Sequence, residues 1–203
     1  MTAGGIVLVT GGSRGIGAAT ATLLAQQGQP VVIVDIAPEA LAGTQTMLWP
    51  DPFDVASETG VVSAIAAIEA AHGPISGLVN AAGVFGKMHA AERVRMDNWD
   101  REINIDLRGT FLVARSVGER MVQRRHGAIV NVASVAGMTS GPIHAYTAAK
   151  AGVIQITQTL AANGAAPACG STPCLPASRA RSRWRRELHR ARWIKTVSLA
   201  TPR

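Results

Sequence analysis

The chain has 203 residues, of which 47% are hydrophobic, and a formal net charge of +7, a size that suits one α/β domain with a real core. No apolar run approaches the ~18 residues of a membrane span, and no charged and apolar leader opens the chain. We therefore expect a cytoplasmic protein without a signal peptide or membrane anchor. Its two cysteines, Cys169 and Cys174, are too few for a structural zinc site or a disulfide framework, and no metal is expected.

The excess of positive over negative charge lies in the C-terminal part of the chain. Residues 1–161 hold 11 Lys and Arg against 12 Asp and Glu, whereas residues 162–203 hold nine against the single acid Glu187. Both cysteines and two of the four tryptophans lie there too. This change of composition predicts one domain over residues 1–161, followed by an atypical basic tail over residues 162–203 that we expect to be poorly ordered.

Residues 1–161 alternate between β-branched runs and segments with helical spacing, without hairpin signals. This alternation predicts an α/β fold with a parallel sheet covered on both faces. The periodic pattern stops after Ala162, so the C-terminal strands are expected to be missing or irregular. The predicted elements, in chain order, are a strand at Ile6–Val9, a helix at Ile16–Gln27, a strand at Val31–Val34, a helix at Val61–Ala71, a strand at Leu78–Val79, a long helix from Trp99 to about Val122, a strand at Ala128–Val132 and a helix from Tyr146 to about Ala161.

A glycine-rich loop joins the first strand to the first helix, with Gly11, Gly15 and Gly17 in the pattern Gly-x-x-x-Gly-x-Gly. Glycines let the backbone turn tightly and approach a pyrophosphate, and the helix N-terminus offers free N–H groups to that anion. The loop therefore predicts a dinucleotide site to which Ser13, Arg14 and Ile16 also belong. An ordinary glycine turn is the alternative.

Two carboxylates follow the loop at informative places. Asp35 ends the second strand, where it can accept both ribose hydroxyls of NAD and would repel the 2′-phosphate of NADP. Arg14 points the other way, because its positive charge could meet that phosphate. On balance the carboxylate makes NAD the favoured cofactor and NADP the less expected one. Asp54, followed by Val55, is placed to accept from the adenine amino group, or else to cap a helix that begins near residues 55–57.

Tyr146 and Lys150 lie one helical turn apart and so share a helix face. A cation beside a phenol favours the phenolate and lowers a pKa that is otherwise about 10. The pair is thus a candidate acid and base near neutral pH. Alone, a tyrosine and a lysine at this spacing are more often surface residues without a function. Here, however, the pair lies in the same chain as a nucleotide-binding loop.

These motifs together resemble the short-chain dehydrogenase/reductase superfamily over residues 5–161. The family pattern is met by Thr10 to Gly17, Asp35, Asp54-Val55, Asn80-Ala81-Ala82-Gly83, Ser134, and Tyr146 with Lys150, in that order. The resemblance implies a Rossmann-type, doubly wound sheet of seven parallel strands. It also implies homodimers or homotetramers built through the helices at residues 99–122 and 146–161, an assembly that the altered C-terminus puts in question.

The resemblance further implies an NAD(P)-dependent oxidoreductase acting on a small secondary alcohol or its ketone. Tyr146 would move the proton of the substrate oxygen, which Ser134 would hold by a hydrogen bond. Lys150 would bind the nicotinamide ribose and depress the pKa of Tyr146. Asn80, Ala81 and Gly83 would support the cofactor and the central helix. For Ser134, a hydroxyl that only satisfies local backbone remains the alternative.

One position departs from the family inside the matched region. Where the family carries an asparagine five residues before an aromatic, this chain has Asp106 before Phe111, and Asn104 stands two residues too early. In the family that asparagine helps to hold a water next to the lysine. The backbone carbonyl and carboxylate of Asp106 could do the same, so we expect slowed or pH-shifted proton transfer rather than its loss.

Past Ala161 the family continues with a strand of roughly Gly-Leu-Arg-Val-Asn-Ala-Val, a Pro-Gly turn and a substrate lid, none of which is present here. One permitted codon spelling of Pro167 to Cys174, read one base out of phase, gives that strand. We therefore hypothesise that residues from about Ala162 are translated out of frame, which would leave a destabilised chain with weak turnover. The alternatives are an impaired nucleotide-binding remnant and, less expected, a nucleic-acid binder using the tail's arginines with Trp184 and Trp193.

Overall fold

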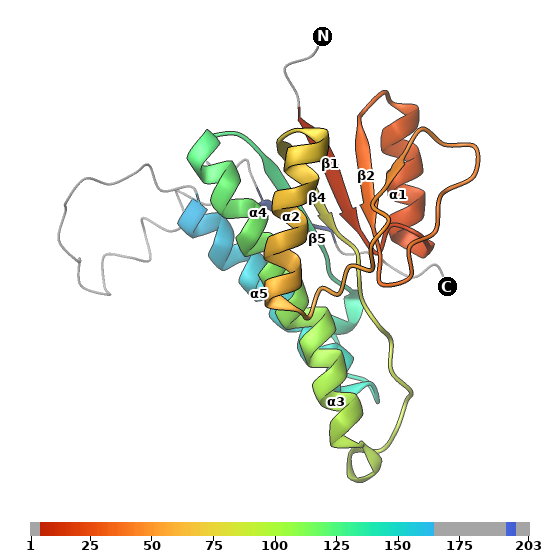
Figure 1. The fold of residues 1–203 in the computed structure, drawn as a ribbon. Helices are drawn as coiled ribbons and strands as arrows, with labels where there is room; N and C mark the ends of the chain where they lie inside the picture. The colour runs from red at the N-terminus through yellow and green to blue at the C-terminus, as the bar shows by residue number, and fades with distance from the viewer. Residues whose placement is uncertain (1–4, 165–193, 198–203) are drawn as a thin grey trace, which may run out of the picture.

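The computed structural model describes residues 5–164 and 194–197, and its centre is a parallel sheet (Figure 1). The strand order is β3-β2-β1-β4-β5-β6, and every neighbouring pair is parallel. The order reverses between β1 and β4, as in Rossmann-type folds, which confirms the predicted fold class. The strands are β1 (Ile6–Thr10), β2 (Val31–Val34), β3 (Met47–Leu48), β4 (Ile75–Asn80), β5 (Ala128–Val132) and β6 (Ile194–Val197).

Helices connect the strands and cover the sheet. In Figure 1, α2, α4 and α5 lie across one face, and α1 lies next to β2. The helices are α1 (Gly15–Gln26), α2 (Glu58–His72), α3 (Met96–Glu102), the π-helical segment η2 (Ile103–Gly109), α4 (Thr110–Arg124) and α5 (His144–Gly164), with short 3₁₀ turns at η1 (Ala91–Arg93) and η3 (Val135–Met138). Within the described ranges, each helix is too short or not apolar enough to cross a membrane.

The core has two parts because successive strand residues point to opposite faces of the sheet. On one face, Leu8 and Leu78 pack in a cluster with Ile65 of α2 and Val113 of α4. On the other, the neighbouring strand residues pack with Ala21 of α1; they are Val9, Val31, Ile33 and Val79. Near-continuous apolar strands of this kind are typical of a parallel sheet buried on both faces.

A buried line of polar side chains crosses the sheet between β1 and α5. The Thr10 hydroxyl donates to Asn80 Oδ1 (3.4 Å), and Asn80 Nδ2 donates to Asn131 Oδ1 (2.9 Å). Asn131 Nδ2 then donates to the Thr157 hydroxyl (2.9 Å), which donates to the carbonyl of Val153 (2.6 Å). Because each buried polar group has a partner, the line fixes β1, β4, β5 and α5 relative to one another.

The long helix predicted from Trp99 to Val122 forms, but with a widened turn inside it. Figure 1 shows α3, η2 and α4 following one another as one rod. Two hydrogen bonds hold the junction: Thr110 Oγ1 donates to the carbonyl of Asp106 (2.8 Å), and Asn80 Nδ2 donates to the carbonyl of Thr110 (3.2 Å). Such π-helical turns are rare and occur mostly at functional sites.

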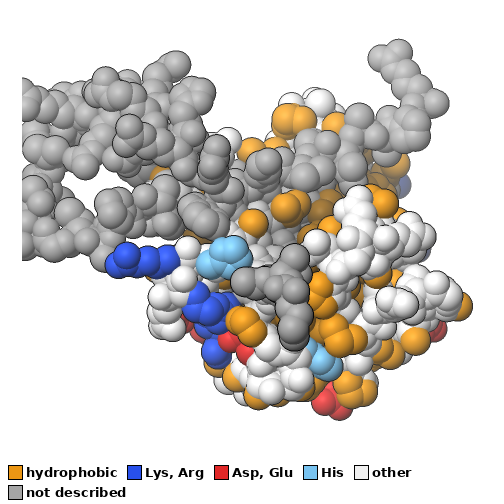
Figure 2. Space-filling view, turned by 90° about the horizontal axis from the view of Figure 1, so that it is seen from above, with side chains coloured by type: hydrophobic (Ala, Val, Ile, Leu, Met, Phe, Trp, Pro, Cys, Tyr) orange, Lys and Arg blue, Asp and Glu red, His pale blue; other side chains and the backbone are white. Residues whose placement is uncertain are grey.

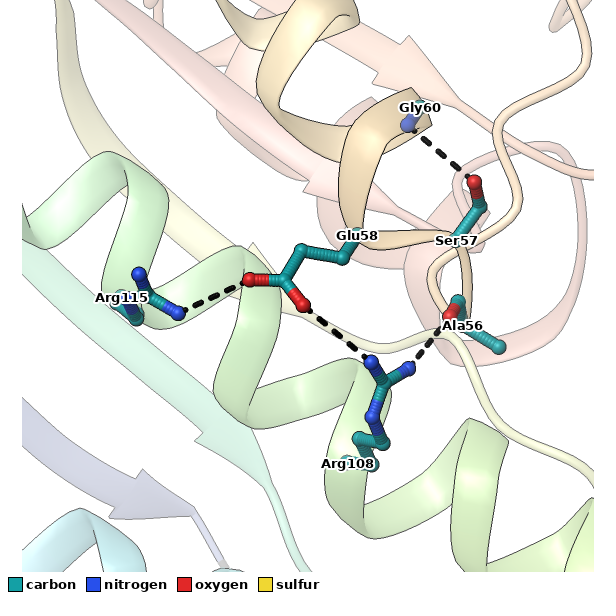
Figure 3. Close-up of polar contacts among 6 residues, drawn as sticks. All are labelled: Ala56, Ser57, Glu58, Gly60, Arg108 and Arg115. Carbon is teal, nitrogen blue, oxygen red and sulfur yellow. Dashed lines mark hydrogen bonds and ion pairs between the residues drawn. The ribbon is translucent and has the colours of Figure 1, made fainter.

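The start of α2 is fastened to this junction (Figure 3). Ser57 caps α2, its hydroxyl accepting from the Gly60 N–H (3.2 Å). Glu58 pairs with Arg108 of η2 and with Arg115 of α4, at 3.5 and 3.2 Å. Arg108 also donates to the carbonyl of Ala56 (2.7 Å). The pairs are exposed and contribute little each, but together they join α2, η2 and α4.

Two further ion pairs between α2 and α4 lie near the amino ends of the strands. Glu69 of α2 pairs with Arg120 and Arg124 of α4, at 3.3 and 2.9 Å. Arg124 also donates to the carbonyl of Ile75 at the start of β4 (2.9 Å). Figure 2 views the molecule from above, and basic side chains gather in one part of this face. Both ends of α2 are therefore joined by ion pairs to the helical rod formed by η2 and α4.

The structure differs from the sequence prediction at the two edges of the sheet. At one edge, β3 has only two residues, too few to show a period in the sequence. At the other, β6 pairs with β5 from Ile194 to Val197, where a missing or irregular strand was expected; this short, mostly β-branched run meets the open hydrogen-bonding edge of β5. Helix α5 continues to Gly164, past the predicted boundary, and the rest of the predicted tail lies outside the described residues.

Candidate active site

The predicted site residues gather where β1, β4 and β5 end, the lower edge of the sheet in Figure 1. Thr10 ends β1 and Asn80 ends β4, and the Thr10 hydroxyl accepts from the N–H groups of Ala81 and Ala82 at 3.1 and 3.2 Å. The glycine loop after β1 and the Asn80–Gly83 segment after β4 are thus joined. In open α/β sheets, ligands bind at this edge, beside the point where the strand order reverses.

The glycine loop has the geometry of an anion-binding turn. Gly11 has φ +63°, and a Cβ there would lie 2.8 Å from Ala82 Cα. A Cβ on Gly17 would collide with the Gly11 carbonyl, whereas nothing lies within 4 Å of the Cβ position of Gly15. Arg14 and Ile16 are exposed at the start of α1, whose first turn holds no acid and no side-chain cap. Free helix N–H groups beside an open glycine fit a pyrophosphate.

Asp35 lies beside this loop and orders it. Its Oδ2 accepts from the Ser13 N–H and its Oδ1 from the Ala37 N–H, both at 3.2 Å. The Ser13 hydroxyl donates to the Glu39 carbonyl (3.0 Å) and accepts from the Glu39 N–H (2.9 Å). Ser13 therefore attaches the segment after β2 to the glycine loop, and both oxygens of Asp35 keep a lone pair for another donor.

Asp54 and Val55 lie between β3 and α2. Asp54 is exposed, and its Oδ1 accepts from the Ala56 N–H (2.9 Å) in a turn that precedes the helix. Because Ser57 is the residue that caps α2, the alternative role of Asp54 as the helix cap is wrong. Val55 is buried against Gly109 of η2, so it packs the segment onto the central helix.

Tyr146 and Lys150 lie together on α5. Lys150 Nζ is 5.5 Å from the centre of the Tyr146 ring and donates to the carbonyl of Val132, at the end of β5 (3.2 Å). Lys150 is only 5% exposed. Burial lowers its pKa from the usual value, and the negative charge of Asp106 opposes that shift. The bond to Val132 thus holds the Lys150 amine beside the Tyr146 ring.

Ser134 follows β5 and begins the turn η3. Its hydroxyl accepts from the Ala136 N–H (3.2 Å), which is the local backbone role that the sequence left open, and its own O–H remains available as a donor. Gly137, in the same turn, lies directly against the backbone of Lys150 and Ala151. The turn that carries Ser134 is therefore packed onto the part of α5 that carries Lys150.

Asp106 is the most unusual residue of the site. It is 0% exposed, its Oδ1 accepts from the Val84 N–H (2.7 Å), and its Oδ2 has no hydrogen-bond partner among the described residues. Burial raises its pKa to about 6, although Lys150 and the Val84 N–H oppose this shift. A Cβ on Gly83 would lie 3.1 Å from Asp106 Oδ1 and 3.5 Å from Lys150 Nζ. The motif glycine thus leaves room for both charged groups.

Phe85 is a neighbour of the site that the sequence did not indicate. Its ring meets the Tyr146 ring edge-on, with centroids 4.9 Å apart, and it is still 62% exposed. A lone aromatic two residues after Gly83 has no distinguishing sequence signal. Only the approach of the loop after β4 to α5 brings it to Tyr146.

Known proteins are similar to this chain in sequence and in fold. D-threitol dehydrogenase of Mycolicibacterium smegmatis is 39% identical over 167 residues, which cover 78% of this chain and 64% of that protein. The crystal structure of NAD⁺-bound xylitol dehydrogenase is 32% identical with a TM-score of 0.75, covering 81% of this chain and 67% of the other. A variant of actinorhodin polyketide ketoreductase with NADPH is 30% identical with a TM-score of 0.74, covering 80% and 66%.

The chain thus spans slightly less than two thirds of its threitol dehydrogenase relative. The family model described as short chain dehydrogenase matches residues 5–168, which include every motif discussed above. On this match, the chain belongs to the short-chain dehydrogenase/reductase family.

Proposed function

We propose that the chain is an NAD-dependent oxidoreductase that interconverts a secondary alcohol and its ketone. The observation that supports this most is the Tyr146–Lys150 pair, held by a bond to the end of β5 at the same sheet edge as the glycine loop. When bound, the nicotinamide supplies the hydride chemistry. The residues of the chain supply binding, orientation and proton transfer.

In the oxidising direction, the Tyr146 phenolate would take the hydroxyl proton as the C=O bond forms and the hydrogen on carbon leaves with its electron pair as hydride, for which bound NAD⁺ would be the acceptor. In the reducing direction, the Tyr146 phenol gives its proton to the carbonyl oxygen as the carbon accepts hydride. Ser134 donates a hydrogen bond to that oxygen, and Lys150 binds the nicotinamide ribose and stabilises the phenolate. Asp106, beside Lys150, is the fourth residue of the proposed catalytic group.

The remaining motif residues would bind the cofactor. The pyrophosphate fits the N–H groups of the loop formed by residues 11–17, and Asp35 can accept the adenosine ribose hydroxyls. Because a carboxylate repels a 2′-phosphate, Asp35 supports NAD over NADP, although Arg14 is exposed nearby and of the opposite charge. Asp54 and Val55 would contact the adenine, and Asn80, Ala81 and Gly83 would line the cofactor side of β4.

The test is to measure turnover of a panel of secondary alcohols and ketones, once with NAD and once with NADP. Turnover is read from the absorbance of the reduced nicotinamide. Replacing Tyr146 by Phe should lower kcat by ~10²–10⁴-fold, because it removes the acid and base and leaves the ring. Cofactor binding, measured by calorimetry, should stay within a few-fold of the wild type. Wild-type turnover in Tyr146→Phe would contradict the proposal.

A second reading is a catalytically impaired nucleotide-binding protein. The observation that favours it is that the Asp35 carboxylate accepts from the Ser13 N–H within the glycine loop, so the nucleotide end of the site is ordered independently of Ser134, Tyr146 and Lys150. Tight binding of NAD without turnover on any substrate of the panel would support this reading over the enzyme.

A further inference from the structure

Phe85 is an aromatic residue that the fold leaves largely in solvent, directly beside Tyr146. Its side chain is 62% exposed, and its ring meets the Tyr146 ring edge-on with the centroids 4.9 Å apart. A ring that stays this exposed contributes little to the core. It nevertheless flanks the side chain that we propose exchanges a proton with the substrate, so a role in binding deserves a test.

The backbone on both sides of Phe85 is packed against the helical rod. Before it, the Val84 N–H donates to Asp106 Oδ1 of η2 (2.7 Å). After it, Gly86 lies so close to Glu102, the last residue of α3, that a Cβ on Gly86 would collide with the Glu102 carboxylate. The place of the Phe85 ring is therefore fixed by the chain on either side of it.

Farther along, the same stretch of chain, residues 84–90, is bonded to the segment that precedes α5. The His89 N–H donates to the carbonyl of Pro142 (3.1 Å), and Nε2 of His144 donates to the carbonyl of His89 (3.2 Å). The two bonds join the chain after β4 to the first residue of the helix that carries Tyr146. They support the arrangement in which the Phe85 and Tyr146 rings meet.

Other large apolar side chains are exposed on the segments that border the site. Met88 belongs to residues 84–90, and Met138 ends η3, the turn that Ser134 caps. They are 65% and 64% exposed. Methionine side chains adapt their shape to apolar ligands, and sites for small molecules are lined mainly by apolar and aromatic residues. The surroundings of Phe85 thus suit an apolar group.

We propose that Phe85 binds the substituent on the reacting carbon of the substrate, and that this substituent is apolar, an aryl or a branched alkyl group. The inference rests on the proposed function, in which the substrate oxygen is hydrogen-bonded to the Tyr146 hydroxyl. That bond brings the groups on the reacting carbon to the ring that flanks Tyr146. An apolar group would remove the Phe85 ring from water, whereas a hydroxylated group would lose hydrogen bonds to water there without replacing them.

Two alcohols of nearly the same shape test this with NAD, because 3-methyl-2-butanol carries a methyl group where 2,3-butanediol carries a hydroxyl. The ratio of their kcat/KM values should favour 3-methyl-2-butanol by ~10-fold or more in the wild type, and should fall by about fivefold or more in Phe85→Ala. Leu23→Ala is the matched control. It truncates another large apolar side chain, 55% exposed on α1, and should leave the ratio unchanged.

The result that overturns the proposal is a ratio unchanged in Phe85→Ala, or a wild-type preference for the diol. An equal loss of kcat with both alcohols also overturns it, since the ring would then only support Tyr146. If Phe85→Ala does not fold, as judged by circular dichroism, Phe85→Leu removes the ring with a smaller loss of volume and is held to the same criterion.

Binding gives a readout that does not depend on turnover. With NAD present, the wild type should broaden the fluorine NMR signal of para-fluoroacetophenone, Leu23→Ala should do the same, and Phe85→Ala should broaden it less. If binding depends on Phe85 but the wild type turns over no substrate of the panel, the proposed function fails and the role of Phe85 stands. If the panel is turned over but neither the ratio nor the broadening depends on Phe85, the role of Phe85 fails and the proposed function stands.

Discussion

At the scale of single residues, the candidate site buries two charged groups at a cost in folding stability. Asp106 is buried with one oxygen lacking a partner among the described residues, and its pKa rises from 3.8 to about 6. Lys150 is buried with a lowered pKa and donates one bond, to Val132. Each group would be better solvated in the unfolded chain, and such costs are common where chemistry needs unusual protonation states.

The cost of Asp106 should depend on pH in a definite direction. Since its pKa is raised on folding, the folded chain binds more protons than the unfolded chain between about pH 4 and pH 6, so stability falls as the pH rises through that range. An asparagine cannot ionise. Between about pH 4 and pH 8, the free energy of unfolding of Asp106→Asn should therefore gain ~2 kcal/mol relative to the wild type.

Denaturant titrations of both proteins at the two pH values measure this gain, with Asp100→Asn, which removes the same charge from an exposed position of α3, as the control that should follow the wild type. If the difference between Asp106→Asn and the wild type is the same at both pH values, the carboxyl does not titrate in this range. Favourable interactions of the ionised carboxylate in the folded chain would then fully offset the free-energy cost of burying it.

At the scale of elements, the widened turn η2 is held from outside the helix. Asn80 bonds to Thr110, the Val84 N–H bonds to Asp106, and Val55 packs onto Gly109. A Cβ on Gly109 would lie 2.7 Å from Val55 Cγ2 and 3.2 Å from the Val55 carbonyl. Glycine at this position lets the segment after β3 approach the central helix closely.

Gly109→Ala should therefore lower the free energy of unfolding by ~1–3 kcal/mol, because the added methyl forces Val55 or the helix to move. Gly118→Ala is the matched control in the same helical rod, since its Cβ would meet only Ile129 Cδ1, at 3.5 Å. That substitution should be neutral or stabilising by up to about 1 kcal/mol through helix propensity. Equal effects of the two substitutions on thermal unfolding would show that the contact at Gly109 is not tight.

The same elements show how far sequence reasoning reaches. Strands such as Val31–Val34 and Ala128–Val132 were predicted with the observed bounds because β-branched runs between turn residues carry a local signal. The turn at η2 was not predicted, because its cause lies in contacts from β4 and from the segment before α2. Phe85 was missed for the same reason. At Asp106, the residue type was evident from the sequence, but its burial and free oxygen depend on the fold.

At the scale of the whole molecule, the family match ends at residue 168, near the change of composition at Ala162. The hypothesis that later residues are read out of frame remains a prediction, and most of them lie outside the described residues. Sequencing the gene decides it: one of the other two frames downstream of codon 162 should encode Gly-Leu-Arg-Val-Asn-Ala-Val or a close variant, followed by a Pro-Gly turn. If neither frame does, the tail is the natural continuation of the chain.

The polar line from Thr10 to Thr157 has a consequence for how this fold could diversify. It connects the strand that leads into the glycine loop with the helix that carries Tyr146 and Lys150, through side chains that are all buried. The separation between the glycine loop and the Tyr146–Lys150 pair is thus set inside the sheet and not by surface segments. Loops at the rim can change in length or composition while the proposed cofactor loop and the proposed proton donor keep their spacing.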